Sequence, residues 1–435
     1  MKAVRGKFFF GGVHPHGNKG LSQAAPLEIM PAPSVVAIST SQSLGKPAVP
    51  VVEVGQQVKL GQLIATADGP ISSDVFSSVS GTVEAIFDGT GANGGREKFI
   101  SIRNNGMDEA ELLPPLSSPT AEEIKTRIKE AGIVGLGGAG FPTAVKVAPR
   151  TPVDTLILNG AECEPYLTCD HRLMLEKTDE IARGARYIAK ALGVNNIIIG
   201  IEANKPDCIE KFEKFDDIKV VILKKQYPMG GEKQLVYVTT GRKIGLPPAL
   251  PADSGVVVQN VATAFAVCEA IELGKPLYER VVTVSGKAVK TPKNIWVRLG
   301  TKVQAIVDYC GGENSNPRKV VQGGPMTGLA LSNYDAYTHK TTSGVLLMTA
   351  DEAAAEEPTP CINCGKCADV CPMHLMPMNT AFYASAGDFE AAAKYGNTLA
   401  CIECGACEYT CPAKRPLIQA IRQTKAEMRK AGGKK

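Results

Sequence analysis

The chain has 435 residues, 44% of them hydrophobic and 21% charged, which is the composition of a globular protein and a length that suggests about three domains. Its formal net charge of +4 is small for this length, and its one basic cluster is the C-terminal sequence KAEMRKAGGKK, which argues against nucleic acid as the main partner. The apolar runs fall short of the roughly 20 residues that span a membrane, and the N-terminus has no signal-peptide pattern. We therefore expect a cytosolic chain, or one attached to a membrane only through partners.

The N-terminal region, residues 1–113, is predicted to contain a barrel-sandwich hybrid domain. Its short apolar segments are separated by turn glycines, and the pattern V-G-x-x-V-K-x-G-Q followed by S-G-T-V resembles the domain of biotinyl and lipoyl carriers. A carrier needs an acceptor lysine on an exposed hairpin, but no lysine lies between Lys59 and Lys98. The domain is therefore predicted to be structural or a docking surface. His14 and His16, in GGVHPHG, belong either to a metal site or to a loop fixed by proline.

A glycine-rich loop at residues 135–140, GLGGAG, follows a predicted helix. Thr120 and Glu123 form a capping-box pattern at the start of the helical sequence AEEIKTRIKEAG, which runs directly into the loop. The loop has the G-x-G-x-x-G pattern of dinucleotide-binding folds, but that pattern requires a strand in front of it and a long helix behind it. A helix in front and Pro142 behind argue against an ordinary NAD site on a Rossmann fold.

Residues 120–275 are predicted to form a Rossmann-like α/β domain. The apolar strands DTLILNG, NNIIIGIE, KVVILKK and GVVVQN alternate with helical segments, including one from about residue 207 to 215. This alternation predicts a mostly parallel sheet covered on both faces.

Three polar segments of this domain lie beside strand ends, at residues 135–146, 159–165 and 227–235. Ligands of open α/β sheets bind outside the carboxyl ends of the strands. There the glycine loop and Lys146 can bind a phosphate, while Asn159 and Glu162 can bond the polar atoms of a ring or a ribityl chain. The alternatives are ordinary turn glycines, an N-G turn and a glutamate that caps a helix.

Two further domains are predicted. Residues 280–335 have a compact, strand-rich pattern with one helix and are assigned to a β-grasp domain of the soluble-ligand-binding type. Residues 355–425 contain eight of the 13 cysteines in two runs, CINCGKCADVCP and CIECGACEYTCP, and each run has the spacing C-x2-C-x2-C-x3-C-P.

The cysteine spacing predicts a helical, ferredoxin-like module with two [4Fe-4S] clusters. Three cysteines of each run bind one cluster, and the fourth binds the other. Zinc sites usually pair two C-x-x-C knuckles and need neither the third cysteine nor the fourth before proline. Such clusters pass single electrons and perform no two-electron chemistry of their own. The ligands are predicted as Cys361, Cys364, Cys367 and Cys411 for cluster 1, and Cys371, Cys401, Cys404 and Cys407 for cluster 2.

Four segments resemble the FMN and NADH site in the flavin-bearing subunit of respiratory complex I: GLGGAGFPTAVK, NGAECEP, YPMGGEKQL and VQNVATAF. The domain order, together with GGVHPHGNKG and QGGPMTG, resembles the C subunit of the Rnf electron-transport complex along essentially the whole chain. The complex I pattern has an arginine where this chain has Leu136, and acids at Ala161 and Gly231. The resemblance implies FMN contacts at Gly135, Gly137, Gly138, Lys146, Asn159, Glu162, Tyr227, Gly230 and Asn260, and NADH contacts at Phe141, Glu164 and Glu232.

The resemblance also implies an activity. NADH would exchange a hydride with FMN, and single electrons would pass through the two clusters to or from partner subunits, with no side chain acting as acid or base. In the Rnf family this couples ferredoxin oxidation to NAD⁺ reduction and ion translocation, and the protein lies peripherally at the cytoplasmic face of the membrane. The alternatives are a cobalamin reductase of the propanediol-utilisation type and a non-enzymatic iron–sulfur adaptor.

Overall fold

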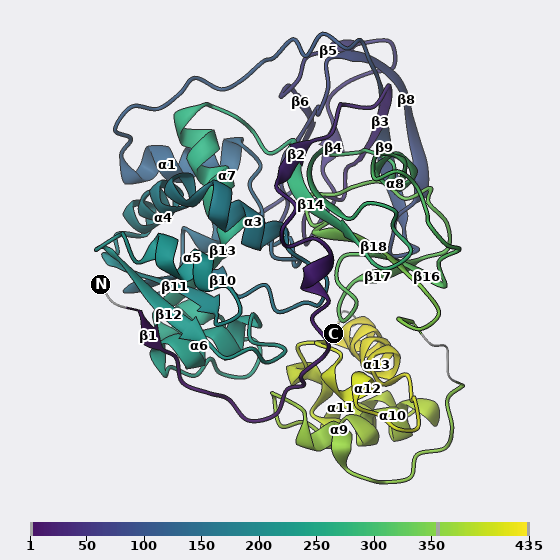
Figure 1. Ribbon diagram of the computed structural model, residues 1–435. Coiled ribbons are helices and arrows are strands. Elements are labelled where there is room, and N and C mark those ends of the chain that lie inside the picture. Colours follow the sequence, from purple (N-terminus) through teal and green to yellow (C-terminus); the bar gives the residue numbers. More distant parts are fainter. Residues whose placement is uncertain (1–2, 354–356, 433–435) are drawn as a thin grey trace.

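The computed structural model describes residues 3–353 and 357–432, which form four packed units and an N-terminal segment that runs between them (Figure 1). None of the helices in these residues combines the length and the apolar character that a membrane crossing requires.

The barrel-sandwich unit consists of two antiparallel sheets, ordered β3-β9-β8-β5 and β4-β6-β7. Val36 and Ile38 of β3 turn inward and are fully buried with Ile64 and Ile100. The predicted barrel-sandwich hybrid is thus confirmed. Its strands are β3 (Val35–Ser39), β4 (Val49–Pro50), β5 (Gln57–Val58), β6 (Leu63–Thr66), β7 (Val75–Phe76), β8 (Gly81–Thr90) and β9 (Arg96–Asn104).

The α/β unit contains a five-stranded sheet in the order β1-β12-β11-β10-β13, and every pair of neighbouring strands is parallel. The strands are β1 (Val4–Arg5), β10 (Thr155–Gly160), β11 (Asn196–Glu202), β12 (Ile218–Leu223) and β13 (Val256–Asn260). The helices are α1 (Ala121–Glu130), α2 (Thr143–Lys146), α3 (Cys169–Glu176), α4 (Thr178–Leu192), α5 (Pro206–Phe212), α6 (Glu232–Thr240), η2 (Pro251–Ser254) and α7 (Val261–Glu272).

Strand β10 shows why this sheet is covered on both faces. Successive side chains of a strand point to opposite faces. Leu156 and Leu158 pack in the core shared with α1, α3, α4, α5 and α7, whereas Ile157 packs on the other face with α6 and Phe9. The predicted parallel sheet with two covered faces is confirmed.

Three helices of the α/β unit, α2, α3 and α6, were not predicted, and none of them has a hydrogen bond to the side chain of its own N-cap residue. Helix α6 begins after Gly231, inside a segment predicted only as a polar loop. Helix α3 begins after Thr168, whose hydroxyl bonds to Asn294 instead of capping the helix. The predicted helix from about 207 to 215 is observed as α5, which begins one residue earlier and ends at Phe212.

A six-stranded mixed sheet in the order β17-β16-β18-β14-β15-β2 forms the third unit. Its elements are β14 (Glu279–Ser285), β15 (Lys293–Arg298), α8 (Val303–Tyr309), β16 (Lys319–Gln322), β17 (Leu329–Leu331), β18 (Gly344–Met348) and β2 (Leu27–Ile29). The sheet therefore takes β18 and β2 from outside the predicted interval 280–335.

The cysteine module, residues 357–432, repeats one local structure twice. A left-handed glycine, Gly365 with φ of 76° or Gly405 with φ of 80°, precedes the short helix α9 or α12. A longer helix follows each run, and the helical module predicted from the spacing is confirmed. The helices are α9 (Lys366–Asp369), α10 (Pro377–Ser385), α11 (Phe389–Gly396), η3 (Thr398–Ala400), α12 (Ala406–Tyr409) and α13 (Leu417–Gly432).

The N-terminal segment, residues 3–29, contributes to other units and does not join the barrel sandwich. Strand β1 pairs with β12 at the edge of the α/β sheet, and β2 pairs with β15. Between them, Phe9 enters the α/β core, Val13 bridges to Tyr227, and the short helix η1 (Lys19–Leu21) follows. Figure 1 shows this segment passing from the α/β unit along the cysteine module to the six-stranded sheet.

Candidate functional site

The carboxyl ends of β10 and β13 mark the place where the strand order reverses. From β10 the chain moves outward through β11 and β12, and it then returns to place β13 on the other side of β10. Open α/β sheets bind their ligands at such a switch point. Asn159 and Asn260, both predicted to contact FMN, are direct register partners there.

The base of the glycine-rich loop is fixed by backbone contacts. The N–H of Gly135 donates to the carbonyl oxygen of Phe141 at 2.8 Å, and the N–H of Leu136 donates to the hydroxyl of Thr263 in α7 at 2.9 Å. Leu136, which stands where the complex I pattern has arginine, is buried in the α/β core. The half-buried Phe141 is thereby held at the loop base.

The tip of the loop is exposed and lies against the switch point. A Cβ atom added at Gly137 would lie 3.3 Å from the Cβ of Asn260, so the loop touches the end of β13. Gly138 has φ of +118° and no atom within 4 Å of a Cβ placed on it. Among the described residues, none accepts a hydrogen bond from the N–H of Gly137, Gly138 or Ala139. These groups can bind an anion.

Lys146 and Asn159 bring the remaining polar groups to the same edge. The Nζ atom of Lys146 lies 2.8 Å from Oε1 of Glu232 and 3.1 Å from the carbonyl oxygen of Val258 in β13. The side-chain amide of Asn159 donates to the carbonyl oxygen of Gly230 at 2.9 Å. The structure therefore brings the three predicted segments together at one switch point.

Asn260 binds the buried carboxyl group of Asp170, a residue that was not predicted to belong to the site. Its Oδ1 accepts from the N–H of Ala262 and caps α7, while its Nδ2 donates to Asp170 at 2.7 Å. Burial, reinforced by the nearby Glu162, raises the pKa of Asp170 to about 6. Asp170 had no sequence signal, because only the fold brings α3 beneath the end of β13.

Glu162, predicted to contact FMN, is occupied by protein groups. One of its oxygens accepts from the N–H of Asp170 at 2.7 Å and of His171 at 3.4 Å, so it caps α3 from outside the helix. Its other oxygen lies 3.5 Å from the Nζ of Lys19, and only 3% of its side chain is exposed. A helix-capping role therefore describes Glu162, although the capping alternative was made for Glu164, the glutamate beside Pro165.

Lys19 of the N-terminal segment fixes the loop that follows β10. Its Nζ donates to the carbonyl oxygens of Glu162 at 2.8 Å, Glu164 at 3.1 Å and Leu167 at 2.5 Å. The sequence GGVHPHGNKG contains this lysine but does not indicate where its side chain goes. The neighbouring His14 and His16 are exposed, and Nδ1 of His14 lies 3.1 Å from the carbonyl oxygen of Lys225.

Glu164, predicted to meet NADH, is bound to the six-stranded unit. Its carboxylate accepts from the N–H of Met326 at 3.0 Å and from the hydroxyl of Thr327. Burial raises the pKa of Glu164 above its ordinary value, although these hydrogen bonds oppose the shift. In this structure Glu164 holds the QGGPMTG loop against the α/β unit.

Tyr227, predicted to contact FMN, points toward the cysteine module. It is buried, and its hydroxyl donates to the carbonyl oxygen of Cys404 at 2.7 Å. Tyr227 also packs with Val13, Ala406 and Met326. The segment that supplies Gly230 to the switch point thus also contacts the loop of the second cysteine run.

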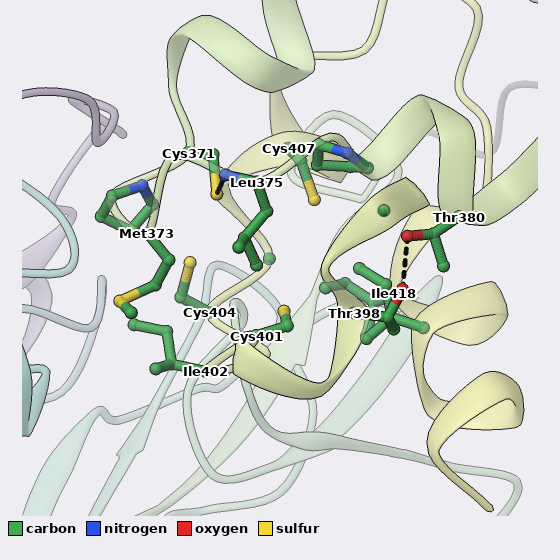
Figure 2. Close-up of a pocket in the computed structure, with 15 residues that line it drawn as sticks. Cys371, Met373, Leu375, Thr380, Thr398, Cys401, Ile402, Cys404, Cys407 and Ile418 are labelled. Atoms are coloured by element: carbon green, nitrogen blue, oxygen red, sulfur yellow. Dashed lines mark hydrogen bonds between the residues drawn. The ribbon is translucent and has the colours of Figure 1, made fainter. Parts of the chain in front are cut away.

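The four predicted ligands of cluster 2 line one cavity. Figure 2 shows Cys371, Cys401, Cys404 and Cys407 around it, together with the apolar side chains of Leu375 and Ile418. Burial, together with the neighbouring thiols of Cys401 and Cys371, raises the pKa of Cys404 to about 12. The fourth cysteine of the first run therefore lies with the first three of the second run, as the spacing predicts.

The predicted ligands of cluster 1 lie nearer the surface. Cys361 and Cys364 are exposed, whereas Cys367 and Cys411 are half-buried and pack in the same apolar cluster around Leu417. Burial raises the pKa of Cys367, and the thiol of Cys411 adds to that shift. Cys411 of the second run thus lies beside the first run.

These residues fit the two kinds of cofactor. A buried thiol with a raised pKa is protonated at neutral pH unless a positive ion stabilises the thiolate, and the iron of a cluster provides that charge. The exposed N–H groups of the glycine loop and the Lys146 ammonium suit a phosphate. Side-chain amides at Asn159 and Asn260 suit the polar atoms of a ring.

Four protein-family models match consecutive parts of the chain. They are the RnfC barrel sandwich hybrid domain at residues 7–107, the Nuo51 FMN-binding domain at 128–269, the SLBB domain at 281–330 and the 4Fe-4S dicluster domain at 360–415. Together with the switch-point site and the cysteine cavity, they define a multidomain flavin and iron–sulfur protein that carries FMN and two [4Fe-4S] clusters.

Curated relatives match nearly the whole chain. It is 46% identical to the C subunit of the proton-translocating ferredoxin:NAD(+) oxidoreductase complex of Clostridium ljungdahlii, over 98% of this chain and 95% of the relative. It is 43% identical to the C subunit of the Na(+)-translocating counterpart of Acetobacterium woodii, over 97% of each chain. It is 44% identical to the C subunit of the ion-translocating oxidoreductase complex of Rhodobacter capsulatus, over 96% of this chain and 82% of that one. The chain belongs to the RnfC family, the C subunits of Rnf complexes.

Proposed function

We propose that this chain is the NAD(H)-linked electron-transfer subunit of an ion-translocating ferredoxin:NAD⁺ oxidoreductase complex. The observation that carries the proposal is the full-length similarity to subunits of such complexes, in a chain whose switch-point site lies next to a two-cluster module. Its partners would be the other subunits of the complex and, through them, ferredoxin. Because NAD(H) is a cytoplasmic nucleotide, we place the protein peripherally at the cytoplasmic face of the membrane.

The residues of the switch point would hold FMN. Lys146 and the N–H groups of Gly137 and Gly138 would bind its phosphate, and Asn159 and Asn260 would orient its polar atoms. When bound, FMN accepts a hydride from NADH and releases the electrons singly. The protein positions this chemistry and needs no acid or base of its own.

The nucleotide would approach from the exposed side of the same site. Phe141, at the loop base, and Glu232, whose side chain is 39% exposed, would face it. Glu164 would act indirectly, by holding the QGGPMTG loop through Met326 and Thr327. The eight cysteines of the two runs would bind the clusters in the two sets already described.

Reconstitution of the full-length chain tests the proposal. The loaded protein should contain one FMN and eight iron atoms, and it should exchange electrons with NAD(H): NADH reduces the clusters, or NAD⁺ reoxidises clusters that dithionite has reduced. Lys146→Met should weaken FMN binding about tenfold or more, because a charge-assisted bond to phosphate is lost. Lys129→Met, on an exposed lysine of α1, is the matched control. A chain that binds iron and sulfide but neither FMN nor NAD(H) would instead be the adaptor of the alternative hypothesis.

The cobalamin reductase alternative makes a different prediction about partners. Co-purification of the chain with integral membrane flavoproteins supports the proposed complex. Co-purification with a bacterial microcompartment shell would contradict it.

A further inference from the structure

The cysteine module is attached to the rest of the chain beside the ligands of cluster 2. The hydroxyl of Tyr227 donates to the carbonyl oxygen of Cys404 at 2.7 Å. The N–H of Gly12 donates at 2.7 Å to the carbonyl oxygen of Val370, the residue before Cys371. The α/β unit and the N-terminal segment thus bind the backbone at one cluster 2 ligand, Cys404, and at the residue before another, Cys371.

Further contacts fall on the same side of the module. The side-chain amide of Gln234 in α6 donates at 3.3 Å to the carbonyl oxygen of Pro372, which follows Cys371. Ala406, fully buried, packs with Val13 and Tyr227. The interface therefore covers both chain segments that carry cluster 2 ligands.

The two equivalent glycines of the repeat differ in what surrounds them. Gly365 and Gly405 have nearly the same left-handed backbone. A Cβ on Gly405 would lie 2.9 Å from the carbonyl oxygen of Met326, whereas a Cβ on Gly365 would meet nothing within 4 Å. The second run is packed against the six-stranded unit at the position where the first run is open.

The exposure of the ligands follows the same division. Cys371 and Cys407 of cluster 2 are buried, while Cys361 and Cys364 of cluster 1 are exposed. Cluster 1 therefore lies on the outer side of the module, where another protein can approach it.

A packed path connects the switch point to cluster 2. Asn159 donates to the carbonyl oxygen of Gly230, and the N–H of Gly230 donates to the Sγ of Cys163 at 3.3 Å. Cys163 packs in the same apolar cluster as Tyr227 and Cys404. Among its described residues this apolar cluster contains Cys404, a predicted ligand of cluster 2, and no predicted ligand of cluster 1.

We propose that cluster 2 exchanges electrons with the flavin and cluster 1 exchanges them with the redox partner, with Tyr227 as the positioning residue at the inner junction. The inference rests on the proposed function. A hydride from NADH carries two electrons and one proton. Each [4Fe-4S] cluster accepts one electron, so one NADH reduces both clusters. NAD⁺ is then released, and the proton passes to water.

Matched ligand variants of the full-length, FMN-loaded chain test the order. Cys364→Ala and Cys404→Ala remove the second cysteine of each run, and dithionite-reduced EPR spectra show which cluster remains. In Cys364→Ala the remaining cluster 2 should still exchange electrons with NAD(H). In Cys404→Ala the remaining cluster 1 should do so more slowly by about tenfold or more. Equal rates in the two variants, or the reverse ranking, would overturn the order. Failure of the wild-type chain itself to exchange electrons with NAD(H) would overturn the proposed function instead.

Tyr227→Phe provides a second test that keeps every ligand in place and applies if a cysteine variant loses both clusters. Removing the hydroxyl that bonds to Cys404 should shift the midpoint potential of one cluster only, because hydrogen bonding around a cluster tunes its potential. A soluble paramagnetic relaxation agent identifies the outer cluster by broadening its EPR signal. The shifted cluster should be the one that the agent does not broaden. A shift of the broadened cluster, or of neither, would contradict the proposal.

Discussion

Replacing Lys340 with methionine is expected to change how the stability of the chain depends on pH. Lys340 is fully buried, and its Nζ donates to Ser73 Oγ at 3.1 Å and to the carbonyl oxygens of Asp74 at 2.6 Å and Gly132 at 2.7 Å. It thereby joins the barrel-sandwich unit to the residue that ends the turn after α1. Burial lowers the pKa of Lys340 from 10.5 to about 7, although the charge of Asp74 opposes the shift.

The magnitude follows from the difference between the two pKa values. The unfolded chain keeps this lysine protonated up to its ordinary pKa, so between pH 7 and 10.5 it binds more protons than the folded chain does. The free energy of unfolding should therefore decrease as the pH falls through this window, and the decrease is complete below pH 7. The shift corresponds to about 5 kcal/mol. Lys340→Met has no proton to bind and should lack this dependence.

Guanidinium unfolding of both proteins between pH 6.5 and 10 measures the effect. The free energy of unfolding of the wild type, relative to Lys340→Met, should rise with pH by up to about 5 kcal/mol. Lys59→Met, on an exposed lysine, is the control and should follow the wild-type slope. If the free energies of unfolding of the wild type and Lys340→Met differ by the same amount at every pH, the reasoning is refuted. That result would mean that the three acceptors keep Lys340 protonated in the folded chain.

Three further substitutions probe the switch point and its support. Lys19→Met should lower the free energy of unfolding by about 3 to 5 kcal/mol, because buried carbonyl acceptors lose their cation. Unfolding is monitored by the fluorescence of the sole tryptophan, Trp296. A decrease below about 1 kcal/mol would count against a loop fixed by Lys19. Gly138→Ala introduces about 1 to 3 kcal/mol of backbone strain at φ of +118°, and the added methyl group fills the open space at the loop tip. It should therefore weaken FMN binding more than Gly137→Ala does. The opposite ranking in a fluorescence titration with FMN would contradict this geometry. Asn260→Ala should destabilise the chain by about 1 to 2 kcal/mol in urea by uncapping α7, and Asn260→Ser should recover part of that loss.

Local sequence patterns were sufficient for the elements whose environment is periodic. The α/β strands are short apolar runs, and the alternation of Leu156, Ile157 and Leu158 between two covered faces explains why the run is continuous. The cysteine spacing predicted which cysteines gather around the cavity at Cys404, because a fixed interval along the chain imposes a fixed arrangement of thiols.

The N-terminal segment could not be predicted in the same way. Strand β1 has two residues, too few for any periodicity, and its partner β12 lies more than 200 residues further along the chain. Lys19 and Phe9 become buried only because distant elements supply carbonyl oxygens or an apolar face. Neither a single lysine nor the short run of Phe8, Phe9 and Phe10 signals this burial locally.

The residues carried over from complex I differ in how the fold uses them. Asn159, Lys146 and the loop glycines meet at the switch point, where strand ends determine their position. Glu164 and Tyr227 lie in the same sequence segments but extend to other units. Sequence can place a segment at a strand end, whereas the direction of a long side chain depends on which unit packs there.

This arrangement makes binding at the switch point and packing of the cysteine module interdependent. Only two residues lie between Tyr227, which bonds to Cys404, and Gly230, which bonds to Asn159 and Cys163. Protein interiors are densely packed, so a shift of this short segment at one end is felt at the other. A ligand that fixes Gly230 should therefore also fix the contact with Cys404. The distance between the flavin and cluster 2 is then determined by this one loop and does not vary with the relative position of two domains.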